Sequence, residues 1–216
     1  SEINWAQVRA ADTWPWLTGL LLLAAFTKSA QLPFHLWLPT AMEAPTPVSA
    51  YLHSATMVKA GIMLMAKFNP LFAGTVYGDV TMYVGLLTML FGGWLAMRQT
   101  DLKALLAYST VSQLGLLTAL LGAGDTFGMT VHLINHAVFK ASLFMVVGII
   151  DHQTGSRDLR VLSGLIRVLP VTSVTGIIAA ISMAGVPPMG GFISKELFIG
   201  NMLGQGPVAL TIAVVG

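Results

Sequence analysis

Three ionisable side chains recur every four residues in an apolar segment of this chain: His132, His136 and Lys140. Each step of four residues turns an α-helix about 40° past one full turn, so all three would share one helix face. A charged lysine at the centre of a bilayer costs on the order of 2.5–3.5 kcal/mol on insertion scales, and such residues mark ion or proton pathways. The spacing therefore predicts a stripe of groups that hold and release protons.

Lysine and histidine suit proton transfer for different physical reasons. Burial disfavours the charged ammonium of a lysine, whereas a nearby carboxylate favours it again. A moving ion or a shifting ion pair can therefore switch a lysine between holding and releasing a proton. Histidines between lysines supply intermediate sites that titrate near neutral pH.

Two other interpretations of the histidine pair are open. His132 and His136 could be buried, hydrogen-bonded histidines without a role in transport. Histidines four residues apart also bind zinc, but no Asp, Glu or Cys lies near them in sequence to complete a coordination shell. The ammonium of Lys140 would also repel a cation. We therefore expect no metal site.

The composition is that of a membrane protein. The chain has 216 residues, of which 55% are hydrophobic and 9% charged, with a mean hydropathy of +0.77. Soluble domains carry about 25% charged residues, so we predict an all-α, polytopic membrane helix bundle. The formal net charge of +2 is too small to suggest nucleic acid as a partner. The chain has no cysteine, which excludes disulfides and cysteine-held iron–sulfur clusters within it.

The ends of the sequence suggest an internal piece of a longer protein. Arg9 and Asp12 precede the first apolar run, so no signal peptide is expected. The chain has no initiator Met, and its last stretch, 197–216, ends in apolar sequence. We expect residues 1–216 to form a single membrane domain within a longer protein.

Six to seven transmembrane helices are predicted, since each needs about 20 apolar residues to cross the hydrocarbon core. The uninterrupted spans are expected at 48–66, 80–97, 104–123 and 126–150. Two further segments contain Pro and Gly and should be discontinuous, and a seventh begins within 197–216. The segment 151–167 is expected to be a hydrophilic loop on the membrane surface.

Each of the two discontinuous segments carries a lysine at its break. The first is the apolar run 14–26, which meets Lys28 and two prolines and should resume near 34–38. The second spans 168–194, is interrupted at 185–188 and is followed by Lys195. Broken helices of this kind form the sites of transporters near the midplane of the membrane. Both breaks are expected to face the interior of the bundle.

The basic residues of the loops predict an orientation. One set of connections should carry most of them: Arg98, Lys103, Arg157, Arg160 and Arg167. The opposite side carries only Arg9 and Lys67. Because cytoplasmic loops are rich in Lys and Arg, the arginine-rich side should be cytoplasmic.

Further ionisable residues are candidates for the same relay. Lys59 lies about eleven residues into its span, roughly 16 Å deep, which is too deep to reach the interface easily. Lys28 lies nearer a helix end, where its ammonium could instead extend to the interface. His53 precedes Lys59 by six residues and need not share its face.

For three other charged residues the sequence leaves two interpretations open. Lys195 and Glu196 are either an interfacial ion pair or part of the relay. Lys103 either takes part in the relay or marks the cytoplasmic interface. Lys103 and Glu196 are therefore secondary candidates.

Several motifs resemble those of the proton-translocating antiporter subunits of respiratory complex I (NADH–quinone oxidoreductase) and of the multi-subunit Mrp sodium/proton antiporters. They are KSAQLPFHLWLP at 28–39, APTPVSA at 44–50, HSATMV at 53–58, DLKALLAYSTVSQLG at 101–115 and HAVFKA at 136–141. The resemblance covers nearly the whole chain. MVKAG at 57–61, DHQTGSRD at 151–158, MAGVPP at 183–188 and FISKE at 192–196 are more similar to the large A subunits of the Mrp branch.

The resemblance implies an antiporter-like fold and a lysine–histidine relay. Lys28 would be the central lysine of the first broken helix and Lys195 that of the second. The residues between them would continue the relay: His53, Lys59, His132, His136 and Lys140. The glutamate partner of Lys28 would lie upstream of this segment.

The resemblance also implies partners and a location. The chain would work with other subunits of an antiporter complex in the plasma membrane, and would move protons and sodium without a cofactor. Two alternatives remain: a non-catalytic, proton-pumping subunit of complex I, and a structural membrane scaffold.

Overall fold

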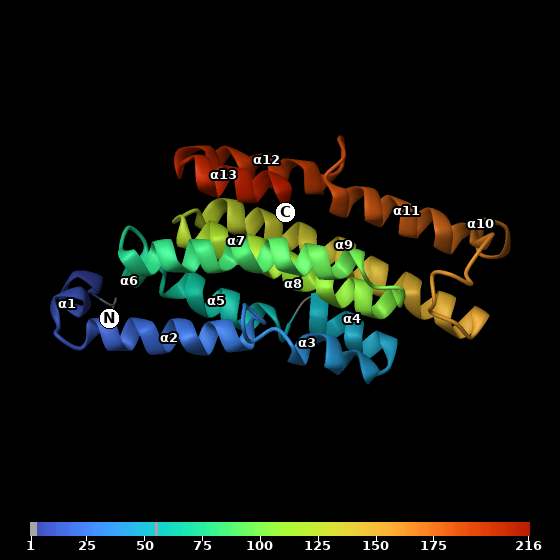
Figure 1. Cartoon of the computed structure of the whole chain (residues 1–216), viewed down its shortest axis with the longest axis horizontal. Coiled ribbons are helices and arrows are strands. Elements are labelled where there is room, and N and C mark those ends of the chain that lie inside the picture. Colours follow the sequence, from blue (N-terminus) through green and yellow to red (C-terminus); the bar gives the residue numbers. More distant parts are fainter. Residues whose placement is uncertain (1–3, 55) are drawn as a thin grey trace.

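The computed structural model describes residues 4–54 and 56–216, and the elements it assigns there are helices. The main helices lie side by side in an elongated bundle (Figure 1). In chain order the elements are α1 (Trp5–Ala10), α2 (Trp14–Lys28), α3 (Trp37–Thr40), η1 (Ala41–Glu43), α4 (Thr46–Ser54), α5 (Lys59–Lys67), α6 (Asn69–Phe72), α7 (Val76–Met97), α8 (Leu102–Gly122), α9 (Thr126–Thr154), α10 (Leu165–Val168), α11 (Pro170–Ala184), α12 (Gly190–Gly204) and α13 (Pro207–Val215).

Three helices of the described chain are long and apolar enough to cross a membrane: α7, α8 and α9. The predicted spans 80–97, 104–123 and 126–150 fall within or close to them. Because each is predominantly apolar over about the thickness of a bilayer, these elements follow directly from the sequence.

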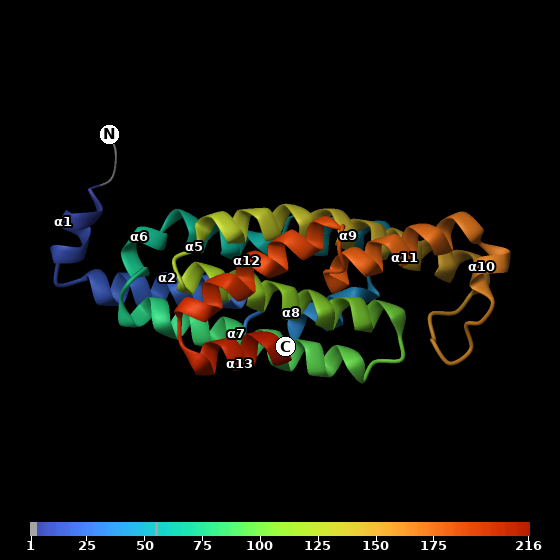
Figure 2. The same ribbon diagram turned by 90° about the horizontal axis from the view of Figure 1, so that it is seen from above.

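Helix α8 is the centre of the bundle. It packs against α7, α9 and α5, and Figure 2 shows it between α7 and α9. Residues 110–122 are all buried, among them the completely buried leucines Leu114, Leu117 and Leu120, as expected of a helix surrounded by its neighbours.

Close backbone contact joins α7 to α8. A Cβ at Gly85 would lie 2.6 Å from the carbonyl oxygen of Gly115, and a Cβ at Gly115 would lie 2.6 Å from that of Gly85. Neither position therefore admits a side chain unless the helices separate. Small residues at such crossings are typical of membrane helices, which gain stability from close packing.

The prediction of one continuous helix over 48–66 is wrong. Helix α4 ends at Ser54 and α5 begins at Lys59, while Ala55 lies outside the described residues, as do residues 1–3. The hydroxyl of Ser54 donates to the carbonyl of Ala50, and that of Thr56 donates to the carbonyl of Tyr51. The interruption contains neither Pro nor Gly.

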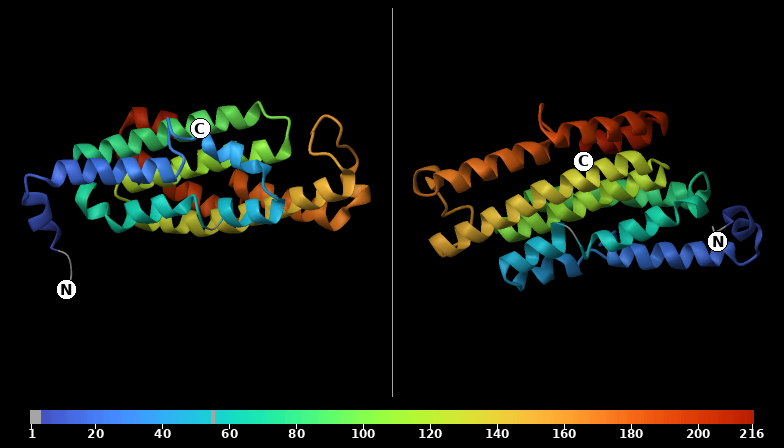
Figure 3. Two further views of the ribbon diagram at one scale, coloured as in Figure 1. Left: turned by 90° about the horizontal axis from the view of Figure 1, so that it is seen from below. Right: turned by 180° about the vertical axis from the view of Figure 1, so that it is seen from behind.

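The ends of several other helices also differ from the sequence prediction. Helix α9 continues to Thr154 and ends where Gly155 adopts a left-handed conformation with φ of 68°, so the loop begins later than residue 151. Helix α2 ends at Lys28, and the next helix begins at Trp37. Helices α11 and α12 are separated by residues 185–189, and Figure 3 shows them along the edge of the bundle opposite α2.

One end of the bundle gathers the charged connections, at the right in Figure 1. The backbone N–H of Leu102 donates to the carbonyl of Arg157 (3.0 Å), and Arg157 also forms a 3.3 Å ion pair with Asp101. In the same loop Arg160 hydrogen-bonds Asp158 and lowers the pKa of that partly buried carboxyl to about 2. The loop therefore stays charged and tied to the start of α8 at physiological pH.

Candidate functional site

The stripe on α9 is buried. His132, His136 and Lys140 are each at most 1% exposed, so the face that carries them turns toward the neighbouring helices. Those neighbours are α4, α8, α11 and α12, which all pack against α9.

Lys140 binds neutral oxygen atoms of α8. Its Nζ donates to the hydroxyl of Ser109 (2.5 Å) and to the carbonyl of Leu106 (3.2 Å). None of the ion pairs formed by the described residues includes Lys140. Two of the three N–H groups of its ammonium thus meet acceptors, and no carboxylate among the described residues fixes the charge in place.

His132 is held by helices on two sides. Its Nε2 lies 2.8 Å from Oε1 of Gln113 on α8, and its Nδ1 lies 3.0 Å from Oγ of Ser194 on α12. Both ring nitrogens are therefore occupied. Within the described residues no group of three or more His, Asp or Glu side chains is placed to hold a metal ion.

His136 lies between His132 and Lys140 along α9. Its ring centre is 6.3 Å from that of His132 and 5.4 Å from that of Phe139. Neither of its ring nitrogens has a hydrogen-bond partner among the described protein atoms. This imidazole is thus fully buried, and both of its ring nitrogens are left without a protein partner among the described residues.

Lys59 and His53 approach opposite parts of the stripe. The Nζ of Lys59 donates to the carbonyl of Leu133 (2.9 Å), next to His132. The ring of His53 instead stacks on Phe144, one turn beyond Lys140, with 5.8 Å between ring centres. Leu133 and Phe144 are roughly 16 Å apart along a helix. Lys59 and His53 therefore contact α9 at different positions, although they are near in sequence.

Lys103 and Lys195 lie outside the stripe. Lys103 is 4% exposed, and its Nζ donates to the carbonyl of Ala44 (3.1 Å) near the charged end of the bundle. Lys195 is partly buried, and its Nζ donates to the carbonyl of Ala184 (3.2 Å), across the gap between α11 and α12. Glu196 is exposed, and it does not pair with Lys195 among the described ion pairs.

Lys28 is exposed on the described chain. The residues after it, Ser29, Ala30 and Gln31, are completely buried. A Cβ on Gly61 of α5 would collide with Ser29 and with the backbone of Ala25. The side of α2 that carries Ala25, together with Ser29, therefore packs against α5, and Lys28 lies next to this buried side.

Four polar residues of the site were not singled out in the sequence: Ser109, Gln113, Asn135 and Ser194. A signal was present for the first two, because Ser109 and Gln113 stand four residues apart in an apolar helix and so share a face. Asn135, three residues after His132, donates from Nδ2 to the carbonyl of Gly190 at the start of α12 (3.0 Å). Polar residues at helical spacing in apolar segments are the common signal.

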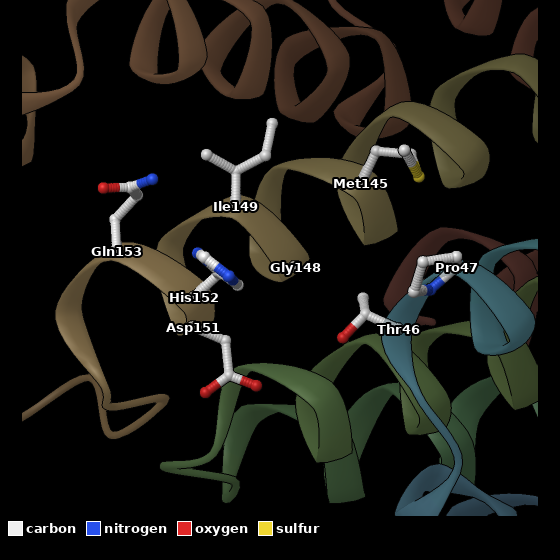
Figure 4. A pocket seen from close by; sticks show the side chains of 8 residues that line it. All are labelled: Thr46, Pro47, Met145, Gly148, Ile149, Asp151, His152 and Gln153. Carbon is white, nitrogen blue, oxygen red and sulfur yellow. The ribbon is translucent and has the colours of Figure 1, made fainter.

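Two hollows lie near the charged end and outside the stripe. One, of about 590 Å³, is lined by polar groups that include Lys103, Asp101 and Glu43. The other, of about 540 Å³, lies where Thr46 and Pro47 face Met145 and Ile149 of α9 (Figure 4). The first hollow brings solvent-accessible space to Lys103.

Apolar helices around a buried row of basic side chains define a multi-pass membrane protein with an ionisable interior. The chain belongs to the NADH:quinone oxidoreductase/Mrp antiporter transmembrane family, whose sequence pattern matches residues 4–216. The resemblance noted in the sequence is thereby confirmed.

Individual relatives point to the Mrp branch. The A subunit of the Na(+)/H(+) antiporter of Bacillus subtilis (strain 168) is 56% identical over 199 residues, which cover 85% of this chain and 25% of that protein. The solved Mrp complex from Dietzia sp. DQ12-45-1b contains a chain that is 46% identical, with a TM-score of 0.89 over 96% of this chain and 24% of that one. A chain of the membrane-bound sulfane sulfur reductase, an archaeal respiratory membrane complex, is 26% identical with a TM-score of 0.84, over 91% and 42% respectively. This chain thus spans about a quarter of the length of its Mrp relatives.

Proposed function

We propose that this chain is a membrane domain, residues 1–216, of the A subunit of a multi-subunit Mrp-type sodium/proton antiporter, and that it carries protons through its buried lysines and histidines. The observation that carries the proposal is Lys140, a fully buried lysine whose partners are a hydroxyl and a carbonyl. A buried ammonium without a carboxylate partner is costly in a membrane. It is most simply explained by a lysine that takes up and releases a proton.

The route follows α9. Lys59 exchanges protons with His132. His136 is the next site along the helix, and Lys140 follows it. The ring centres of the two histidines are 6.3 Å apart, a gap that bridging water can span. A proton then moves along the stripe in short steps.

Beyond the stripe, the route continues at both ends. His53, stacked near Lys140, and Lys103, at the polar hollow, lead toward the charged end. Lys195, next to Ser194, connects the stripe to α12, with Glu196 as a secondary site. Lys28 is exposed on the described chain. It connects to the route through groups contributed by the rest of the protein.

Two transmembrane helices are discontinuous in this proposal. Helices α11 and α12 have 15 residues each, which is short of the about 20 residues that cross a bilayer, so together they form one span interrupted at 185–189. Helices α2 and α3, on either side of residues 29–36, form the other. Interrupted helices are tolerated in membranes where they line a cavity or a protein interior, as expected beside a relay.

The chain lies in the plasma membrane together with the other subunits of the complex. Its arginine-rich end, with Arg98, Arg157, Arg160 and Arg167, faces the cytoplasm, since positive loops remain on that side. Protons and sodium are the transported ions, and the chain needs no cofactor.

A proton-pumping subunit of a redox complex is the second candidate, favoured by the similarity to the archaeal respiratory complex. The test is proton movement in vesicles that carry the full assembly. A sodium gradient alone should drive protons if the chain belongs to an antiporter. Proton movement that requires electron transfer, and ignores sodium, would instead support the redox-driven pump.

A further inference from the structure

Three helices meet at His132 through a row of four polar groups. The row runs from Gln113 on α8 to His132 on α9 and then to Ser194 on α12, with distances of 2.8 and 3.0 Å. The hydroxyl of Ser194 also lies 3.0 Å from the carbonyl of Gly191 in its own helix, which is the fourth group. The Ser194 oxygen thus has two neighbours to which its single hydrogen can point.

The geometry accommodates two protonation states of His132. With both ring nitrogens protonated, Nε2–H donates to Gln113 and Nδ1–H donates to Ser194, whose hydrogen then points to Gly191. With a proton only on Nε2, the bond to Gln113 is kept, and the Ser194 hydroxyl turns to donate to Nδ1. A hydroxyl can fill either role because it is both donor and acceptor and rotates freely. No other group of the row has to move.

The rotation changes hydrogen bonding in the first turn of α12. The carbonyl of Gly191 accepts from Ser194 in one state and not in the other. The same turn is held by Asn135, which donates to the carbonyl of Gly190. It also packs tightly on α11, because a Cβ at Gly191 would collide with the carbonyl of Ser182. The residue after Ser194, Lys195, reaches back to the carbonyl of Ala184.

We propose that Ser194 is a positioning residue whose hydroxyl changes its hydrogen-bond partner with the protonation state of His132. The change alters the hydrogen bonding of the first turn of α12, which carries Lys195. This inference rests on the proposed function of the chain. The proton that Nδ1 of His132 gains or loses comes from or goes to the water that bridges His132 and His136 in the proposed route, while the Ser194 hydroxyl only turns. Ser194 thus couples the stripe on α9 to the gap between α11 and α12. Gln113 keeps the ring in place in both states.

Three titratable side chains of the described chain surround His132. The titratable groups that act on it are His136 on its own helix, Lys59 on α5 and Lys195 on α12. On the side of α8 the ring meets only the neutral amide of Gln113. A change confined to Ser194 therefore leaves the nearby charges as they are.

The test is the pH dependence of sodium-driven proton exchange by the full complex in vesicles. Ser194→Ala removes a partner from both states of His132, but the cation loses more because a charge-assisted hydrogen bond is about twice as strong as a neutral one. The pH of half-maximal exchange should therefore move down by about half to one unit. Ser194→Thr keeps the hydroxyl and should restore the profile.

Two further variants separate coupling from structure. Asn135→Ala loosens the same turn of α12 without touching His132, so it should lower the rate and leave the pH profile unchanged. Ser142→Ala removes a serine whose hydroxyl binds the carbonyl of Val138 within α9, and it should have no effect.

The outcomes are distinct. An assembled Ser194→Ala complex with an unshifted profile would overturn the role of Ser194, as would an equal shift in Asn135→Ala. Either result would leave the relay intact if Lys140→Ala still abolishes exchange. Loss of sodium-driven exchange in the unmodified complex would instead overturn the proposed function.

Discussion

Lys59 donates a hydrogen bond from α5 to the carbonyl of Leu133 on α9, at 2.9 Å. The contact places an almost fully buried ammonium beside His132, at the end of the stripe opposite Lys140. The two histidines of α9 therefore lie between two lysines, Lys140 from α9 itself and Lys59 from α5.

Replacing Lys59 by Met should reduce sodium-driven proton exchange by about tenfold or more, which corresponds to about 1.4 kcal/mol or more on the barrier. Methionine is similar in length and apolar, so the bundle should still assemble. Lys67→Met, an exposed lysine eight residues further along, is the matched control and should retain exchange. Equal activity of both variants would remove Lys59 from the route.

Replacing Ser109 by Ala should lower the exchange rate several-fold without loss of assembly. The variant deletes the hydroxyl that accepts a hydrogen bond from Lys140, while the carbonyl of Leu106 continues to hold the ammonium. A buried charge that loses one of its hydrogen bonds is destabilised by about 1–3 kcal/mol. Ser109→Thr should restore the rate, and the account of this contact fails if Ser109→Ala and Ser109→Thr exchange equally fast.

Replacing Gly85 by Leu should destabilise the chain, since its side chain would enter the backbone of α8 near Gly115. Overpacking of this kind costs about 1–3 kcal/mol or more. Thermal unfolding of the complex in detergent measures the effect. The control is Gly200→Leu on α12, where a Cβ meets nothing within 4 Å. A Gly85→Leu complex as stable as the Gly200→Leu complex would contradict the close α7–α8 contact.

The long helices could be predicted from sequence because one physical property decides them. Residues 80–97 and 104–123 are predominantly apolar and carry no charged side chain, and a helix satisfies their backbone within a membrane. The end of α9 was predicted too early because Asp151 and His152 are polar, and polarity alone does not end a helix. The left-handed Gly155 does.

Other features depend on contacts between distant segments. The interruption between α4 and α5 contains neither Pro nor Gly, so composition did not reveal it. The exposure of Lys28 on the described chain depends on which side of α2 meets α5. The row Gln113, His132 and Ser194 forms only where three helices meet, and spacing along one helix predicted only its central member.

The most direct test of the relay is sodium-driven proton exchange by full complexes that carry Lys140→Ala or Lys140→Arg, with assembly of the complex measured in parallel. Alanine removes a buried charge together with its desolvation penalty, so assembly should persist while exchange is abolished or sharply reduced. Arginine should not rescue exchange, because a guanidinium does not release its proton in this range. If Lys140→Arg exchanged protons at a near-normal rate while Lys140→Ala failed to assemble, Lys140 would be a structural cation and the relay would be contradicted.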